Sequence, residues 1–256
     1  MTTVSDITTS LAERTRPELA AVWDPVGLQL GDPAASVESV AVCHEVTEEV
    51  VSAIEADPVD LVVTYHPLLF EPVNRILAGR SAGARALRLL KVGVSLLVTH
   101  TDFDAAPGGM ADSLAWVFKL RGLQVFGSDA DEGLSGIGRV GEFDGGLAEV
   151  DAIAADVFGS SGLRISGDPS LEVERLAVIP GSGSRFVEEA AQLADALVTG
   201  DVSHHHAVRA LDLGLAIVDP GHIATERPGM SALRNLVSDV VSFQVTDLTE
   251  LDPSTW

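Results

Sequence analysis

Apolar and polar residues alternate along this chain in two repeating patterns. Short runs rich in β-branched residues, such as DLVVTY at 60–65 and VSLLVT at 94–99, precede stretches of Ala, Leu and Glu with helical spacing. Buried parallel strands appear as continuous apolar runs, and the helices that connect them have a period near 3.6. The pattern therefore predicts an α/β protein with two lobes and mainly parallel or mixed sheets.

The same pattern predicts the positions of individual elements. We expect strands at 39–46, 60–65, 94–99, 137–143, 163–166, 175–179, 196–199, 216–218 and 243–246. We expect helices within 5–20 and at 47–56, 82–91, 110–120, 147–158, 184–194, 203–213 and 225–240. Thr47 is the expected N-cap of its helix, because its hydroxyl can accept a backbone hydrogen bond and two acidic residues follow it.

Residues 127–146 differ from the rest of the chain. Their sequence, GSDADEGLSGIGRVGEFDGG, is rich in Gly and Asp and is typical of a loop between compact parts. We therefore expect a discontinuous first lobe of residues 1–126 plus 196–256, which carries the metal ligands, and a smaller second lobe of residues 127–195. The chain shows no repeat and no long linker, so we expect the lobes to form one compact unit.

Composition removes several classes of function. The 256 residues include 38 acidic and 16 basic ones, for a formal net charge of −22, which opposes nucleic-acid binding. A lone cysteine, Cys43, permits neither an intrachain disulfide nor a cysteine-rich zinc site. No apolar run is long enough for a membrane helix, and the first twenty residues lack a secretory pattern, so we expect a cytoplasmic protein.

Polar residues follow the ends of four predicted strands. They are His66 after 60–65, His100 and Asp104 after 94–99, Asp201 and His204–His206 after 196–199, and His222 after 216–218. The carboxyl ends of parallel strands meet at one edge of a sheet, where ligands of α/β proteins bind. We therefore expect these side chains to converge.

Four of these positions predict a metal site. His222 and Glu226 are four residues apart at the start of a helix and so lie on one helix face. Together with His66 and Asp104 they form a set of imidazole and carboxylate ligands that suits one or two ions of Zn, Mn, Fe, Co or Ni. The structural alternative is that each residue caps a helix or bonds to backbone.

The remaining candidates give weaker signals. Consecutive helical residues point in different directions, so we expect His205 to be the one pocket residue of the histidine run, together with Asp201. We expect His44 and Glu45 to lie in a solvated loop.

Five segments resemble one known family. They are WDPVGLQLGDP (23–33), TYHPLLFEPVNRI (64–76), THTDFDAAPGGMADSLA (99–115), TGDVSHHHA (199–207) and DPGHIATE (219–226). In family order and spacing they resemble the Nif-three-like (NGG-one-interacting-factor-three-like) family, whose members are often labelled GTP cyclohydrolase 1 type 2 homologues. The resemblance implies a short bacterial form, without a central insert domain, that assembles into a toroidal hexamer with a dinuclear metal centre. By position, the implied ligands are His66, Asp104, His222 and Glu226.

This chain departs from the family pattern at one ligand position. The family has His-His-Pro where this chain has Tyr65-His66-Pro67. A phenol has a pKa near 10 and is a poor ligand unless the metal lowers that value. The number of ions therefore stays open between one and two.

Two functions follow as hypotheses. The first is a metal-dependent hydrolase acting on a nucleotide-like substrate, with Glu226 or His100 as general base. The alternative is a non-catalytic, metal-binding hexameric ring for metal handling or protein interaction.

Overall fold

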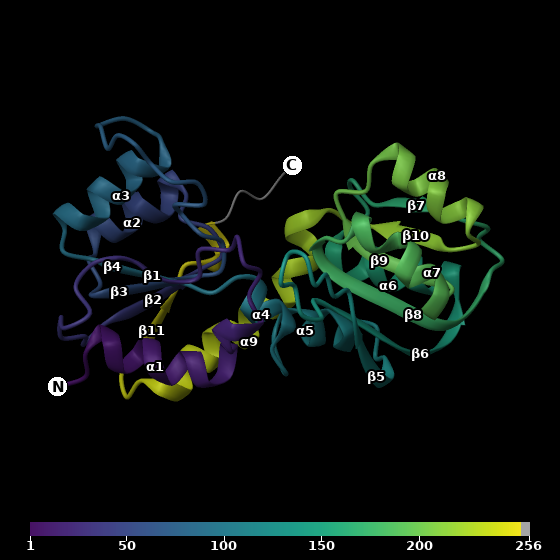
Figure 1. The fold of residues 1–256 in the computed structure, drawn as a ribbon, viewed down its shortest axis with the longest axis horizontal. Helices are drawn as coiled ribbons and strands as arrows, with labels where there is room; N and C mark the ends of the chain where they lie inside the picture. The colour runs from purple at the N-terminus through teal and green to yellow at the C-terminus, as the bar shows by residue number, and fades with distance from the viewer. Residues whose placement is uncertain (252–256) are drawn as a thin grey trace. The chain divides into compact units, whose positions relative to one another are not determined.

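The computed structural model describes residues 1–251, which form two compact units, each built around one β-sheet. Of the described residues, unit 1 contains 1–103 and 230–251, and unit 2 contains 104–229. Two helices, α4 (Thr101–Ala105) and α9 (His222–Val240), continue across the boundaries between the units. Figure 1 labels the elements along the chain.

Unit 1 contains a five-stranded sheet in the order β1-β4-β3-β2-β11. Its strands are β1 (Gly27–Leu30), β2 (Val40–Cys43), β3 (Leu61–Thr64), β4 (Ser95–Val98) and β11 (Val245–Asp247). Its other elements are α1 (Val4–Thr15), η1 (Pro17–Leu19), α2 (Glu48–Ala56), α3 (Ala82–Lys91), η3 (Thr249–Leu251) and the last part of α9. The sheet is parallel except at β1, which pairs antiparallel with β4.

Helices cover both faces of this sheet. Figure 1 shows α2 and α3 over one face and α1 with α9 over the other. Strands β2 and β3 are buried along their whole length, which explains why they appear as uninterrupted apolar runs. Thr47 caps α2 as predicted, because its hydroxyl accepts the backbone N–H of Val50.

Unit 2 contains a six-stranded sheet in the order β5-β6-β8-β9-β10-β7. Its strands are β5 (Arg121–Phe126), β6 (Gly138–Gly146), β7 (Arg164–Ser166), β8 (Glu172–Ser182), β9 (Ala196–Gly200) and β10 (Ala216–Asp219). Its helices, besides the start of α9 and the end of α4, are α5 (Met110–Val117), α6 (Leu147–Phe158), η2 (Ser184–Phe186), α7 (Val187–Leu193) and α8 (His204–Asp212).

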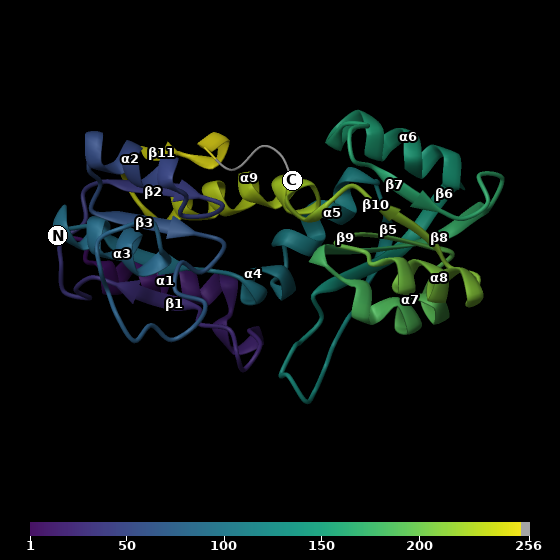
Figure 2. The ribbon, with the colours of Figure 1, turned by 90° about the horizontal axis from the view of Figure 1, so that it is seen from above.

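The unit 2 sheet is mixed. Strands β8, β9 and β10 are parallel, whereas β5, β6 and β7 are joined to their neighbours by antiparallel pairing. Helices α5 and α6 share one apolar core with the sheet, and Figure 2 shows α7 and α8 on the face opposite α6. The predicted α/β class with mixed sheets is thus confirmed.

The division of the chain differs from the one predicted. The prediction assigned 196–256 to the first lobe and 127–195 to the second, but β9 and β10 pair with β8 and so belong to unit 2. Strand β5 also joins unit 2, because it pairs with β6. Within residues 1–251, no helix combines the length and apolar character needed to cross a membrane.

Candidate metal centre

Two neighbouring parallel strands of unit 1 bring three candidate side chains together. The ladder between β2 and β3 continues beyond the strand ends, because the Tyr65 N–H donates to the Cys43 carbonyl at 3.2 Å. The His66 N–H donates to the His44 carbonyl at 2.8 Å. The Thr64 hydroxyl lies within hydrogen-bond distance of the carbonyls of both His44 and His66, at 3.2 Å and 3.1 Å. Backbone pairing therefore sets His44, Tyr65 and His66 side by side at the carboxyl edge of the sheet.

These residues form a cluster of aromatic rings with His100. The His44 and Tyr65 rings are stacked, with centroids 5.5 Å apart and planes 5° apart. The His66 ring lies 4.7 Å from that of His44 and 5.2 Å from that of His100. His44 is fully buried and Tyr65 is 1% exposed. The prediction that His44 lies in a solvated loop is therefore wrong, because the Tyr65 ring from the adjacent strand covers it.

His100 is held by a buried carboxylate. Its Nδ1 lies 3.0 Å from both oxygens of Asp24, whose side chain is fully buried. The backbone N–H and the hydroxyl of Thr101 also donate to Asp24. Burial raises the pKa of Asp24, but hydrogen bonds and charge from His100, with the bonds from Thr101, lower it by more, so the net pKa falls. Asp24 is thus an anion that accepts a hydrogen bond from Nδ1 of His100 and fixes the orientation of the ring.

Sequence reasoning did not assign a role to Asp24. The residue lies within the segment WDPVGLQLGDP, but that segment contributed only to the resemblance. Its contact with His100 spans 76 residues of the chain, and no local pattern predicts such a pair.

Unit 2 carries a second arrangement of candidate residues. His222 starts α9 and lies between two carboxylates: its Nδ1 is 2.7 Å from Asp201 and its Nε2 is 3.0 Å from Glu226. Burial lowers the pKa of His222, but hydrogen bonds and charge from Glu226 and then Asp201 raise it by more, to about 9. At neutral pH both ring nitrogens of His222 therefore donate hydrogen bonds. His222 thus fixes the orientation of the Glu226 carboxylate. Glu226 is only 2% exposed.

Two glycines make room for this pair. A Cβ on Gly200, at the end of β9, would lie 2.5 Å from the backbone nitrogen of His222. A Cβ on Gly181, whose φ is +63°, would lie 2.6 Å from Oε1 of Glu226. Close approach of backbone to the site thus requires glycine at both positions.

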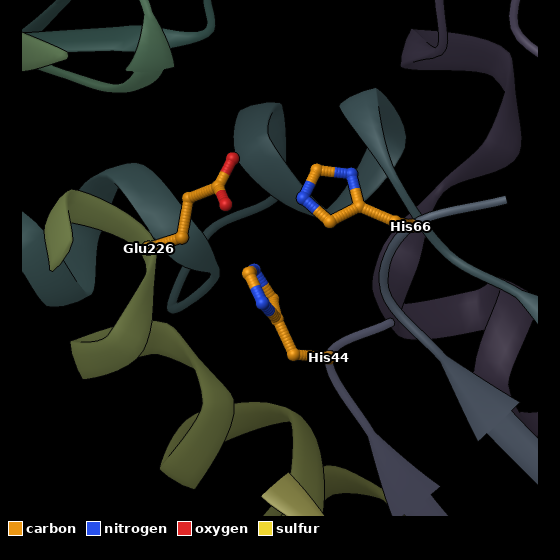
Figure 3. Close-up of side chains that lie close together, drawn as sticks. All are labelled: His44, His66 and Glu226. Carbon is orange, nitrogen blue, oxygen red and sulfur yellow. The ribbon is translucent and has the colours of Figure 1, made fainter. Parts of the chain in front are cut away.

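Three residues could hold a metal ion. His44, His66 and Glu226 each offer one ligand atom, and these atoms lie within 4.8 Å of one another. Figure 3 shows the three side chains: His44 follows β2, His66 follows β3, and Glu226 comes from α9. Two imidazoles and a carboxylate are ligands that zinc and neighbouring transition metals accept.

Comparison with known proteins identifies the family. The model of the family described as Duf34/NIF3 (NGG1p interacting factor 3) matches residues 2–251. The chain belongs to this family. A curated relative from Streptomyces coelicolor, named GTP cyclohydrolase 1 type 2 homolog, is 34% identical over 236 residues, which cover 89% of this chain and 83% of the relative. A relative of the same name from Clostridium perfringens is 30% identical over 209 residues, or 80% of each chain.

Solved structures agree with this Duf34/NIF3 assignment. Reduced HcgD from Methanocaldococcus jannaschii superposes with a TM-score of 0.84 at 25% identity, over 96% of this chain and 98% of HcgD. A Staphylococcus aureus protein superposes with a TM-score of 0.89 at 24% identity, over 100% of this chain and 99% of its own. The second likeness shows the shared fold alone.

The structure places the other predicted residues of this Duf34/NIF3 chain as follows. Asp104 is 6% exposed in α4, and its assignment as a metal ligand stays a prediction. Asp201 bonds to His222, but its side chain is 57% exposed. His205 is exposed on α8. Its neighbour His204 lines a separate pocket of about 210 Å³ in unit 2.

Proposed function

We propose that this chain is a metal-dependent hydrolase whose metal ion is held by His44, His66 and Glu226. One observation supports the proposal: the ligand atoms of these residues lie within 4.8 Å of one another, and His44 and Glu226 are buried. Two imidazoles and one carboxylate form the ligand set of many catalytic zinc sites, which keep a coordination position for water or substrate. Mn, Fe, Co and Ni accept the same ligand types.

A metal ion at this set would supply Lewis-acid activation of water and of a carbonyl or phosphoryl oxygen. The general base is His100. Asp24 holds the proton on its Nδ1, so Nε2 accepts the proton that leaves the attacking water. The His100 ring is 5.2 Å from that of His66, and this proximity supports the choice of His100 as the base. Glu226, the other base considered from the sequence, is assigned here as a ligand.

His222 serves Glu226 in this proposal. Its Nε2–H donates to the Glu226 carboxylate at 3.0 Å, and Asp201 holds the other ring nitrogen at 2.7 Å. Partners of this kind orient a ligating carboxylate, and their loss weakens metal affinity by about 10- to 100-fold.

The names of the curated relatives support a substrate class. We propose that the substrate is nucleotide-like and that the reaction is a hydrolysis of the GTP cyclohydrolase type, because the Streptomyces coelicolor relative carries that name. A surface with a net charge of −22 repels a polyphosphate, so productive binding of a nucleotide would depend on the metal as the local positive centre.

The test separates metal binding from catalysis. Protein stripped of metal is reloaded with Zn, Mn, Fe, Co or Ni and assayed against nucleotides, phosphoesters and cyclic amides. His66→Ala and Glu226→Gln are expected to lose both metal and turnover, whereas His100→Gln keeps the metal and loses turnover. His205→Ala, on the surface of α8, is the matched control and should keep both.

The outcomes decide between the two candidate functions. Turnover that needs His66 and His100 supports the hydrolase. Metal binding without turnover on any substrate overturns it and supports a non-catalytic metal-binding ring. Tyr65→His, which restores the family pattern, is expected to raise the metal content from one ion towards two.

Oligomeric state is a separate proposal. The resemblance to the family supports a homohexamer, for which light scattering after size exclusion would give about six chain masses. A monomer would rule out a hexameric assembly for both candidate functions.

A further inference from the structure

Two aromatic side chains of unit 1 are exposed and in contact with each other. The rings of Trp23 and Phe70 have centroids 5.7 Å apart and are tilted by 55°. Trp23 is 44% exposed and Phe70 is 50% exposed. Both rings also lie near the His100 ring. The distance between ring centroids is 6.4 Å for Trp23 and 6.5 Å for Phe70. The pair therefore borders the ring cluster that contains the proposed general base.

Hydrogen bonds hold both aromatic residues in place. Trp23 precedes Asp24, whose carboxylate bonds to His100 and Thr101. Phe70 follows Leu69, whose backbone N–H donates to the Gln29 side chain at 2.9 Å and whose carbonyl accepts from the same side chain at 3.1 Å. Two exposed rings on anchored backbone form a surface that exists before any ligand binds, which reduces the entropic cost of binding.

We propose that Trp23 and Phe70 form a stacking site for the planar heteroaromatic ring of the substrate. The proposal rests on the proposed function, because it places that ring beside the metal ligands and the general base. Tryptophan and phenylalanine faces attract the π-face of any nucleobase-like ring, independently of its hydrogen-bonding pattern. The strongly acidic chain favours recognition of a neutral ring over recognition of phosphate groups.

Calorimetric titration of the full chain tests the site, with guanosine, adenosine, uridine and nicotinamide as probes and ribose as the non-aromatic control. Stacking on one aromatic side chain corresponds to about 5- to 150-fold in affinity. Trp23→Leu and Phe70→Leu should each weaken binding of the aromatic probes by that factor, whereas Trp23→Phe, which keeps a ring, retains most of it. Trp116→Leu is the matched control, since Trp116 is 55% exposed in unit 2.

Four results would overturn the proposal: no aromatic probe binds, ribose binds as well as guanosine, Trp23→Leu binds like Trp116→Leu, or Trp23→Leu changes only the oligomeric state. The last result would assign the aromatic pair to a contact between copies of the chain.

Titrations are run on metal-stripped and metal-loaded protein, with metal content measured separately. Ring binding to protein that takes up no metal would refute the proposed function and leave the stacking site standing. Metal uptake without binding of any aromatic probe would refute the stacking site and leave the proposed function standing.

Discussion

Replacing Asp24 by asparagine removes one buried charge with almost no change in volume. The wild-type carboxylate is fully buried and accepts from Nδ1 of His100 and from the N–H and hydroxyl of Thr101. An asparagine side chain has one acceptor oxygen, and its NH2 group would face a donor. We therefore expect Asp24→Asn to destabilise the fold and to release the His100 ring from its fixed orientation.

The size of the effect follows from the bonds lost. A hydrogen bond to a charged group contributes about 1.5–3 kcal/mol, and an unsatisfied buried donor costs about 1–3 kcal/mol. We expect Asp24→Asn to lower the free energy of unfolding by about 2–4 kcal/mol, read as a lower urea midpoint at unchanged m-value. Asp32→Asn is the control in the same segment, because Asp32 is exposed and its carboxylate accepts a hydrogen bond from the N–H of Ala34. A change of about 0.5 kcal/mol is expected there.

The pH dependence gives a second reading of the same variant. The pKa of Asp24 is lower in the folded chain than in the unfolded one. Its contribution to the free energy of unfolding is therefore present above about pH 4 and is lost as the pH falls through the pKa of the folded state. The gap between wild type and Asp24→Asn should close in acid. Equal urea midpoints for Asp24→Asn and Asp32→Asn at pH 7 would refute the reasoning.

Two further perturbations test the environment of Glu226. Gly200→Ala would place a Cβ 2.5 Å from the backbone nitrogen of His222, and backbone atoms cannot move aside cheaply, so we expect a loss of about 1–3 kcal/mol in urea unfolding. Gly83→Ala, in helix α3 with 3.4 Å of clearance, should be neutral or stabilising, and a similar loss there would contradict the steric argument. The pKa of His222 is raised to about 9, so its contribution to the stability of metal-free protein is present below pH 6.5 and is lost as the pH rises through 9. The melting temperature of the metal-free wild type should fall as the pH rises through 9, and that of His222→Gln should fall less. Identical pH profiles for the two proteins would contradict the role of His222.

The buried parallel strands could be predicted from the sequence, whereas the exposed edge strand could not. Strands β2, β3 and β4 are buried at every position and so appear as apolar runs. Strand β5 is mostly exposed at the edge of its sheet and begins with Arg121-Gly122, and its apolar alternation is limited to residues 123–125. Its pairing with β6 depends on tertiary contacts that a local pattern does not contain.

The same limit applies to the candidate site. His66 and Glu226 could be identified from their positions after a strand and on a helix face. His44 could not, because its burial and its stacking on the Tyr65 ring of the neighbouring strand are tertiary features that a local pattern does not contain. Asp24 could not, because its partners lie 76 and 77 residues away.

Metal content per chain, measured by inductively coupled plasma mass spectrometry on untagged protein purified without chelator, tests the central claim most directly. The account predicts at least one transition-metal ion per chain. Its loss is expected in His44→Ala, His66→Ala and Glu226→Gln, and its retention in His205→Ala. Wild-type protein without metal, or His44→Ala with the full wild-type content, would contradict the assignment of the site.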